Sequence, residues 1–194
     1  MPSEEQTARS TPRPLRSRMA FAIMFFLIAT ITTALDLLTK SWIFGRLGMP
    51  GTSGTLWVWQ DVFGFQTALN EGALFGMGQG FVPGFAFLSI AMLIGIMIWL
   101  LGPFYKNWFL VMIMGLISGG IIGNLYDRLG LHGLCWPDDG FHVADTPVYA
   151  VRDWILVMIG TYHWPNFNLA DSYLVAGVIL LAIYVFFFVE PPKR

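Results

Sequence analysis

Four long apolar stretches constrain this chain more than any other feature of its sequence. An α-helix rises about 1.5 Å per residue, so about 20 consecutive apolar residues cross the hydrocarbon core of a bilayer. Lipid offers no partner for backbone N–H and C=O groups, so each segment that spans must be helical. The sequence therefore predicts an all-α integral membrane protein with four transmembrane helices, at residues 19–38, 83–101, 108–125 and 169–189.

The composition agrees with a surface that faces lipid rather than water. Hydrophobic residues make up 56% of the chain and charged residues 12%, whereas soluble domains carry about 25% charged residues. The formal net charge of −1 provides no field that attracts nucleic acid, so no nucleic acid partner is expected. The single cysteine, Cys135, can form neither an internal disulfide nor a cysteine-based zinc site.

The flanking segments predict how the chain lies in the membrane. Residues 1–18 are polar and basic, and we expect a disordered cytoplasmic tail before a membrane domain at 19–190. No small-residue cleavage site follows this tail, so we interpret the first stretch as a retained anchor. The side with both termini and the 102–107 turn carries seven Lys and Arg residues, against four on the other side. This bias predicts cytoplasmic termini and extracytoplasmic loops at 45–80 and 129–168.

Both long loops contain segments with a structure of their own. The segment TLWVWQDVFGFQTAL, within 45–80, combines β-branched and aromatic residues with local alternation, which predicts two short strands bent at Gly64. The segment VRDWILVMIG, at 151–160, is apolar enough to lie along the membrane surface, where we expect an interfacial helix.

Acids and amides beside the apolar stretches need an explanation, because a charge at membrane depth costs about 3 kcal/mol on insertion scales. Asp36 and Lys40 share one helix face and form either a structural ion pair or part of a site. Asn70 is either a turn residue or part of a site. At the start of the fourth stretch, Asn168 and Asp171 could be simply a helix cap and its first-turn acid.

A second polar group ends the third stretch, in the segment GGIIGNLYDRLG. Asn124 and Arg128 are four residues apart and share a helix face. Asp127 and Arg128 could form no more than a charge pair at the membrane boundary. The glycines of this segment let another helix or a substrate chain approach closely.

Several catalytic classes lack their motif in this sequence. HExxH is absent, and His132, His142 and His163 lie in loops without ligand spacing, so we expect no metal. Ser118 lacks the preceding glycine of a rhomboid-type serine site, and P-loop and dinucleotide motifs are also absent, so we expect no cofactor. What remains is carboxylates, amides and one arginine at the outer membrane boundary.

Five short motifs point to one family. They are DLLTK at 36–40, NEGALFG at 70–76, GNLYDR at 123–128, VRDWI at 151–155 and FNLADS at 167–172. In this order on a four-span chain, they resemble the motifs of lipoprotein signal peptidase, also called signal peptidase II. The resemblance implies an aspartic peptidase of the bacterial cell membrane, with four helices, a small extracytoplasmic β-cradle and an active site near the extracytoplasmic face.

The resemblance also implies roles for individual residues. Asp153 and Asp171 match the catalytic acids of the family. Two adjacent carboxylates cannot easily both ionise, so they share a proton, and one activates water while the other protonates the scissile carbonyl. The positions that surround the acids and the substrate match Asp36, Lys40, Asn70, Asn124, Arg128 and Asn168.

The implied substrate is a prolipoprotein whose cysteine carries diacylglycerol, cleaved just before that cysteine. Membrane lipids are the other expected partner, and we expect a monomer.

Two rival functions remain open. An ion-coupled transporter would also keep Asp36, Asp171 and Arg128 at membrane depth, although the chain has no internal repeat. The other rival is a non-enzymatic scaffold of the cell envelope.

The chain departs from the family pattern between Arg128 and Asp153. This stretch is longer than usual, and the extra residues, about 131–149, contain three further acids: Asp138, Asp139 and Asp145. They lie in a polar loop with Pro and Gly, where we expect solvated acids rather than catalytic ones. In addition, Arg152 stands where small or apolar residues are usual.

Overall fold

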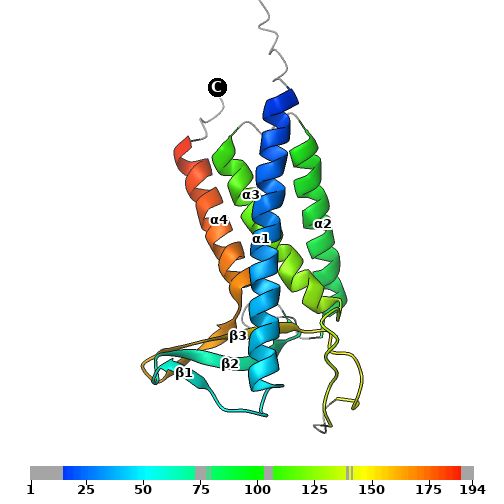
Figure 1. Cartoon of the computed structure of the whole chain (residues 1–194), viewed down its shortest axis with the longest axis vertical. Coiled ribbons are helices and arrows are strands. Elements are labelled where there is room, and N and C mark those ends of the chain that lie inside the picture. The colour runs from blue at the N-terminus through cyan, green and yellow to red at the C-terminus, as the bar shows by residue number, and fades with distance from the viewer. Residues whose placement is uncertain are drawn as a thin grey trace, which may run out of the picture.

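The computed structural model describes residues 15–72, 78, 80–102, 107–138, 140 and 142–188. Four long helices stand side by side, and a four-stranded antiparallel sheet lies across one end of the bundle (Figure 1). The helices are α1 (Leu15–Leu47), α2 (Val82–Leu101), α3 (Trp108–Arg128) and α4 (Leu169–Phe188). The strands are β1 (Leu56–Trp59), β2 (Phe63–Asn70), β3 (Val151–Ile159) and β4 (Tyr162–Phe167).

Within the described ranges, all four helices are long and apolar enough to cross a membrane, with mean hydropathy from 1.9 to 2.4. Helix α1 begins at Leu15 and therefore includes the end of the segment expected to be a tail, of which residues 1–14 lie outside the described part. It also continues to Leu47, beyond the predicted end at residue 38. Lys40, Ile43 and Phe44, which follow the apolar run, are buried against other elements, so the helix does not stop where the hydropathy falls.

Helix α3 is the most buried of the four and packs against the other three (Figure 1). Its glycines permit this close packing. A Cβ atom on Gly120 would lie 2.7 Å from the carbonyl oxygen of Ala170 and 2.8 Å from Cγ of Leu174. Since real contacts are longer, α4 can approach α3 this closely only over a residue without a side chain.

The sheet corrects the all-α description and two of the expected elements. The bend between β1 and β2 lies at residues 60–62, where Asp61 adopts a φ of 56°, and not at Gly64. Gly64 lies within β2, where a Cβ atom would be 3.0 Å from the carbonyl oxygen of Leu56 on β1. The interfacial helix expected at residues 151–160 is wrong, because this segment forms β3 between β2 and β4.

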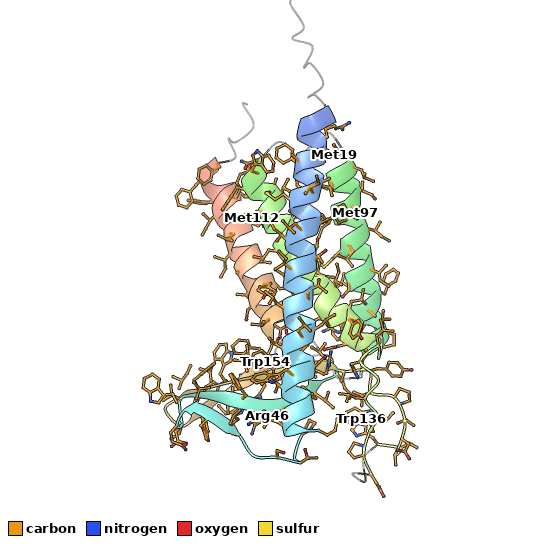
Figure 2. All side chains as sticks on the ribbon, in the orientation of Figure 1. Met19, Arg46, Met97, Met112, Trp136 and Trp154 are labelled. Atoms are coloured by element: carbon orange, nitrogen blue, oxygen red, sulfur yellow. The ribbon has the colours of Figure 1, made fainter. Side chains whose placement is uncertain are left out.

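Burial explains why β3 was not predicted as a strand. Its first six residues are all buried, and Trp154 and Ile155 pack against Ile43 and Phe44 of α1. A strand covered on both faces is a continuous apolar run and lacks the alternation that marks a half-exposed strand. Figure 2 shows Trp154 where the sheet meets the helices.

The longer loop between α3 and β3 is folded back on itself. The backbone N–H of Trp136 donates to the carbonyl of Thr146 at 2.9 Å, and Cys135 forms an isolated β-bridge with Pro147. The rings of Trp136 and His142 stack at a centroid distance of 3.5 Å. These contacts give the loop a defined shape beside the sheet, where Figure 2 labels Trp136.

Candidate active site

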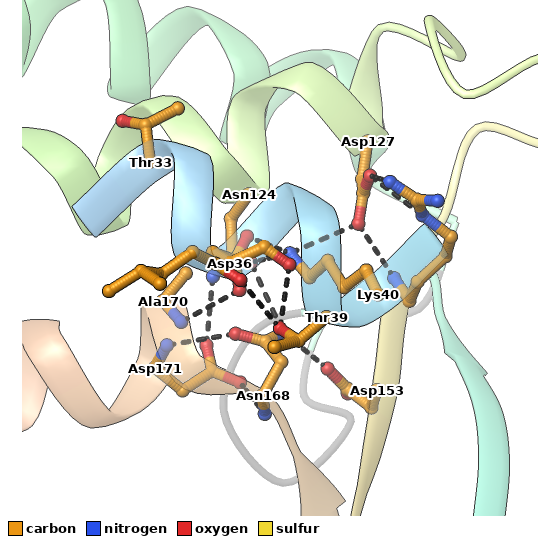
Figure 3. Close-up of polar contacts among 12 residues, drawn as sticks. Thr33, Asp36, Thr39, Lys40, Asn124, Asp127, Asp153, Asn168, Ala170 and Asp171 are labelled. Atoms are coloured by element: carbon orange, nitrogen blue, oxygen red, sulfur yellow. Dashed lines mark hydrogen bonds and ion pairs between the residues drawn. The ribbon is translucent and has the colours of Figure 1, made fainter. Parts of the chain in front are cut away.

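Polar side chains from α1, α3, α4 and the sheet meet where the sheet joins the bundle (Figure 3). None of the seven central residues is more than 4% exposed, and their hydrogen-bonding groups face one another. Burial of so many polar groups is tolerated only when they are mutually satisfied. The seven are Asp36, Lys40, Asn124, Asp127, Arg152, Asp153 and Asn168.

Asn168 and Asp171 form a reciprocal cap at the start of α4. The backbone N–H of Asp171 donates to Oδ1 of Asn168 at 2.9 Å, and the backbone N–H of Asn168 donates to Oδ2 of Asp171 at 3.1 Å. Another N–H group of the first helical turn, that of Ala170, donates to Oδ1 of Asp36 at 2.9 Å. The capping interpretation is therefore confirmed, and it leaves Oδ1 of Asp171 to accept a hydrogen bond from Nδ2 of Asn124 at 2.8 Å.

Asp153, which lies on β3, is bonded to the side-chain amide of Asn168. Its Oδ1 accepts from Nδ2 of Asn168 at 2.6 Å, and its Oδ2 accepts from Nδ2 of Asn70 at 3.2 Å. Figure 3 shows Asn168 between Asp153 and Asp171. The two acids, far apart in sequence and on different elements, thus share one hydrogen-bonding partner.

The surroundings of Asp153 favour its protonated form. Burial, and to a lesser extent the charge of Asp171, raise the pKa of Asp153 to about 8. Hydrogen bonds from Asn168 and Asn70 and the charge of Lys40 act in the opposite direction but are weaker. At neutral pH the Asp153 carboxyl therefore carries a proton.

Lys40 is fully buried, and three side-chain oxygens surround its ammonium nitrogen. Its Nζ lies 2.7 Å from Oδ2 of Asp36, 3.0 Å from Oδ1 of Asn124 and 3.1 Å from Oδ2 of Asp127. The ion pair predicted between Asp36 and Lys40 is confirmed. The pair also belongs to the larger polar network, because Lys40 donates to Asn124.

Asp127 and Arg152 were not predicted to interact with each other. Asp127 is bound by Lys40 and by the guanidinium of Arg152, with Nη2 of Arg152 2.8 Å from Oδ1 of Asp127. Its role therefore goes beyond a boundary charge pair with Arg128. No spacing rule connects Asp127 to a strand so far along the chain, and the only signal was the unusual arginine beside Asp153.

A cavity of about 700 Å³ opens beside Asp171. Its polar lining includes Asn70, Asn124, Arg128 and Asp171, and the lining continues along the apolar flank of α4 to Ile179. Arg128 donates to the carbonyl oxygen of Gly72 at 3.2 Å. It also borders a second cavity of about 650 Å³. Asn70, Asn124, Arg128 and Asp171 are thus accessible to a bound molecule.

The competing acids of the long loop lie elsewhere. Asp138 and Asp145 are exposed, and the described lining of the first cavity includes neither; Asp139 lies outside the described residues. Within the part of the chain that the structure describes, no group of three His, Cys, Asp or Glu side chains is placed to hold a metal ion.

Known structures define the class of protein. A bacterial membrane enzyme solved by the in meso method at 2.3 Å resolution aligns with a TM-score of 0.67 and 26% identity, covering 88% of this chain and 93% of that one. A second such structure, at 1.9 Å resolution, gives a TM-score of 0.66. The fold is that of a multi-pass bacterial membrane enzyme.

The family follows from sequence comparison. The family model described as signal peptidase (SPase) II matches residues 28–187. The chain therefore belongs to the signal peptidase II family of aspartic peptidases, which confirms the family resemblance. The lipoprotein signal peptidase of Rhodopirellula baltica is 43% identical over 185 residues, covering 91% of this chain and 79% of the relative. That of Geobacillus thermodenitrificans is 34% identical, covering 89% and 95%.

Proposed function

We propose that this lipoprotein signal peptidase uses Asp153 and Asp171 as its catalytic pair, to cleave diacylglyceryl-modified prolipoproteins just before the lipidated cysteine. The observation that carries the proposal is the shared amide: Asn168 donates to Asp153 at 2.6 Å and forms the reciprocal cap with Asp171. Asp153 also holds a proton at neutral pH because burial raises its pKa to about 8.

The mechanism follows from the different surroundings of the two acids. In the resting enzyme the shared proton resides on Asp153. Asp171 takes a proton from water, which attacks the scissile carbonyl while Asp153 protonates the carbonyl oxygen. The tetrahedral intermediate then collapses as a proton passes to the leaving amine. Because water is the nucleophile, no covalent intermediate with the enzyme is needed.

The supporting residues orient the acids and the substrate. Asn124 donates to Oδ1 of Asp171 at 2.8 Å, and Lys40 fixes Asn124 by donating to its Oδ1 at 3.0 Å. Asn70 holds the far oxygen of Asp153 at 3.2 Å. Arg128 lies at the cavity with its guanidinium 5.5 Å from the ring centroid of Phe85, where it is placed to bind a carbonyl of the peptide.

The cavity suits a substrate that enters from the bilayer. Its polar end lies at Asp171, and its apolar side follows Val175, Ala176 and Ile179 along α4. A prolipoprotein in this cavity would keep its apolar parts in lipid while the bond to be cut reaches the acids. All of these residues come from one chain, so we propose that the enzyme acts as a monomer among membrane lipids.

For the orientation, we propose cytoplasmic termini and an active site near the extracytoplasmic face. The excess of Lys and Arg beside the termini supports this orientation. Cys135, the only cysteine of the sequence, is exposed in the long loop, so its labelling reports on the orientation directly. A membrane-impermeant maleimide should label Cys135 in spheroplasts with an intact membrane, but not a cysteine at Ser10 in a Cys135→Ser background. The opposite pattern of labelling would reverse the orientation.

Cleavage of a diacylated prolipoprotein in detergent tests the catalytic pair. Asp153→Asn and Asp171→Asn should each abolish cleavage while the protein still inserts into the membrane. Asp138→Asn and Asp139→Asn are the matched controls and should cleave nearly normally. Normal turnover by either variant of the pair would remove that acid from the mechanism. Loss of activity in a control variant would indicate that a catalytic acid lies in the long loop. A wild-type chain without cleavage activity would favour a transporter or a scaffold.

A further inference from the structure

Arg152 directly precedes Asp153 in the sequence but binds a different part of the molecule. Successive residues of a strand point to opposite faces, so the two side chains leave β3 in opposite directions. Asp153 faces Asn168, whereas Arg152 faces the ends of α3 and α1. Arg152 is only 3% exposed, which is rare for an arginine and requires full satisfaction of its donors.

The backbone and the side chain of Arg152 hold the same carboxylate. Its Nε and Nη2 donate to Oδ1 of Asp127 at 3.0 and 2.8 Å, and its backbone N–H donates to Oδ2 of Asp127 at 3.0 Å. Its Nη1 donates to Oγ of Ser41 on α1 at 3.3 Å. Charge-assisted bonds of this kind are strong and directional, so they fix both the position and the rotation of β3 relative to α3.

The sheet supports this part of β3 on one side only. Val151, Arg152 and Asp153 pair with Asn70, Leu69 and Ala68 of β2. The pairing with β4 begins at Ile155 and Phe167, so β4 does not pair with the strand beside Asp153. The bonds to Asp127 therefore hold the start of β3 in addition to its single ladder with β2.

The helix end that receives these bonds also positions the second acid. Asp127 and Asn124 lie one turn apart on α3, and Asn124 donates to Asp171 at 2.8 Å. The chain of contacts from Asp153 through β3 and Arg152 to α3 thus ends at Asp171. A shift at the Arg152 contact would change the distance between the two acids.

The network also balances its charges. Two cations, Lys40 and Arg152, face two carboxylates, those of Asp36 and Asp127. All four residues are buried, so removal of one leaves a charge without its partner. Removal of one cation and one carboxylate together restores the balance.

We propose that Arg152 is a positioning residue of this peptidase, which clamps the start of β3 onto Asp127 and so sets the separation of Asp153 and Asp171. The guanidinium of Arg152 is buried and bonded to Asp127 and Ser41, so Arg152 acts on the acids through these contacts. The proposal rests on the proposed function, because it takes these two acids as the catalytic pair.

The test measures kcat and KM for a diacylated prolipoprotein peptide, with kcat expressed per folded enzyme. Arg152→Lys keeps the positive charge but loses the paired Nε and Nη2 donors of the guanidinium, and should lower kcat about tenfold. A displacement of a catalytic group by about 1 Å lowers the rate by up to about 100-fold. The KM of Arg152→Lys should stay within about twofold of the wild-type value. Arg46→Lys, at an exposed arginine of α1, is the matched control and should change neither constant.

A double variant separates positioning from a loss of folding. Arg152→Gln and Asp127→Asn should each lower kcat about 100-fold per folded enzyme. Asp127→Asn combined with Arg152→Gln restores the charge balance and allows an amide-to-amide bond, so it should be at least tenfold more active than either single variant. If the two positions acted independently, the loss of kcat in the double variant would equal the product of the two single losses.

Two results would overturn the proposal. The first is a wild-type kcat per folded enzyme in Arg152→Lys and Arg152→Gln, even if less folded enzyme is recovered. The second is a double variant whose loss equals the product of the single losses. Full activity of Asp153→Asn would overturn the proposed function instead, so the two failures can be told apart.

Discussion

Asp153→Asn should stabilise the folded enzyme while it abolishes cleavage, and the gain should depend on pH. Burial raises the pKa of Asp153 from 3.8 to about 8. Between these values the folded chain binds a proton that the unfolded chain lacks, so wild-type stability falls as pH rises through this window. The slope is about 1.36 kcal/mol per pH unit, and an asparagine, which does not titrate, contributes none.

The size of the effect follows from this slope. Between pH 5 and pH 7, the difference in unfolding free energy between Asp153→Asn and wild type should grow by about 2.7 kcal/mol in favour of the variant. The amide also loses an acceptor for Asn168 or Asn70, which costs about 1–3 kcal/mol. That cost is the same at every pH, so it moves the whole curve without changing its slope.

Unfolding of the purified enzyme in detergent at pH 5, 6 and 7 measures this difference. The exposed residue Asp138 provides the control, and Asp138→Asn should follow the wild-type curve. A difference between Asp153→Asn and wild type that is constant with pH, or that shrinks as pH rises, would refute a protonated Asp153 in the folded enzyme.

Three further predictions concern the same region. Cleavage by the wild-type enzyme should fall as pH rises through about 8, because Asp153 loses its proton there; a pH–rate profile that stays flat to pH 9 would contradict this. Lys40→Met leaves the buried carboxylate of Asp36 without its cation and should cost about 3–5 kcal/mol in thermal unfolding; unchanged stability would mean that the ion pair is dispensable. Gly120→Ala forces a Cβ against the carbonyl of Ala170 and should cost about 1–3 kcal/mol, whereas Gly95→Ala, with open space around it, should not destabilise the protein.

The helices were predictable because the membrane imposes their length, and β1 and β2 because alternation marks a half-exposed strand. The limits of α1 and the nature of β3 were not predictable for one shared reason. Predictions from hydropathy and alternation assume that each face of a helix or strand contacts one kind of surrounding along its whole length. The last part of α1, with Ile43 and Phe44, covers β3, so both segments are buried by a contact between distant parts of the chain.

The same limit applied to the site. Motifs identified Asp153, Asp171 and their amides, because these residues lie in short recognisable segments. The partnership of Asp127 with Arg152 joins a helix end to a strand, and no spacing within either segment predicts it. The long loop between Asp127 and Arg152 further hid this contact, since the two residues lie far apart in the sequence.

The start of α4 shows why a structural and a catalytic interpretation of Asp171 need not compete. A helix N-terminus has free N–H groups and a partial positive charge, so a negative charge placed there is stabilised. The cap uses Oδ2 of Asp171 and leaves Oδ1 facing Asn124 and the cavity. Asp153, in contrast, is enclosed in a strand and keeps its proton because of burial. In the proposed catalytic pair, one helix start and one buried strand therefore give two acids of the same chemical type different surroundings on the two sides of Asn168.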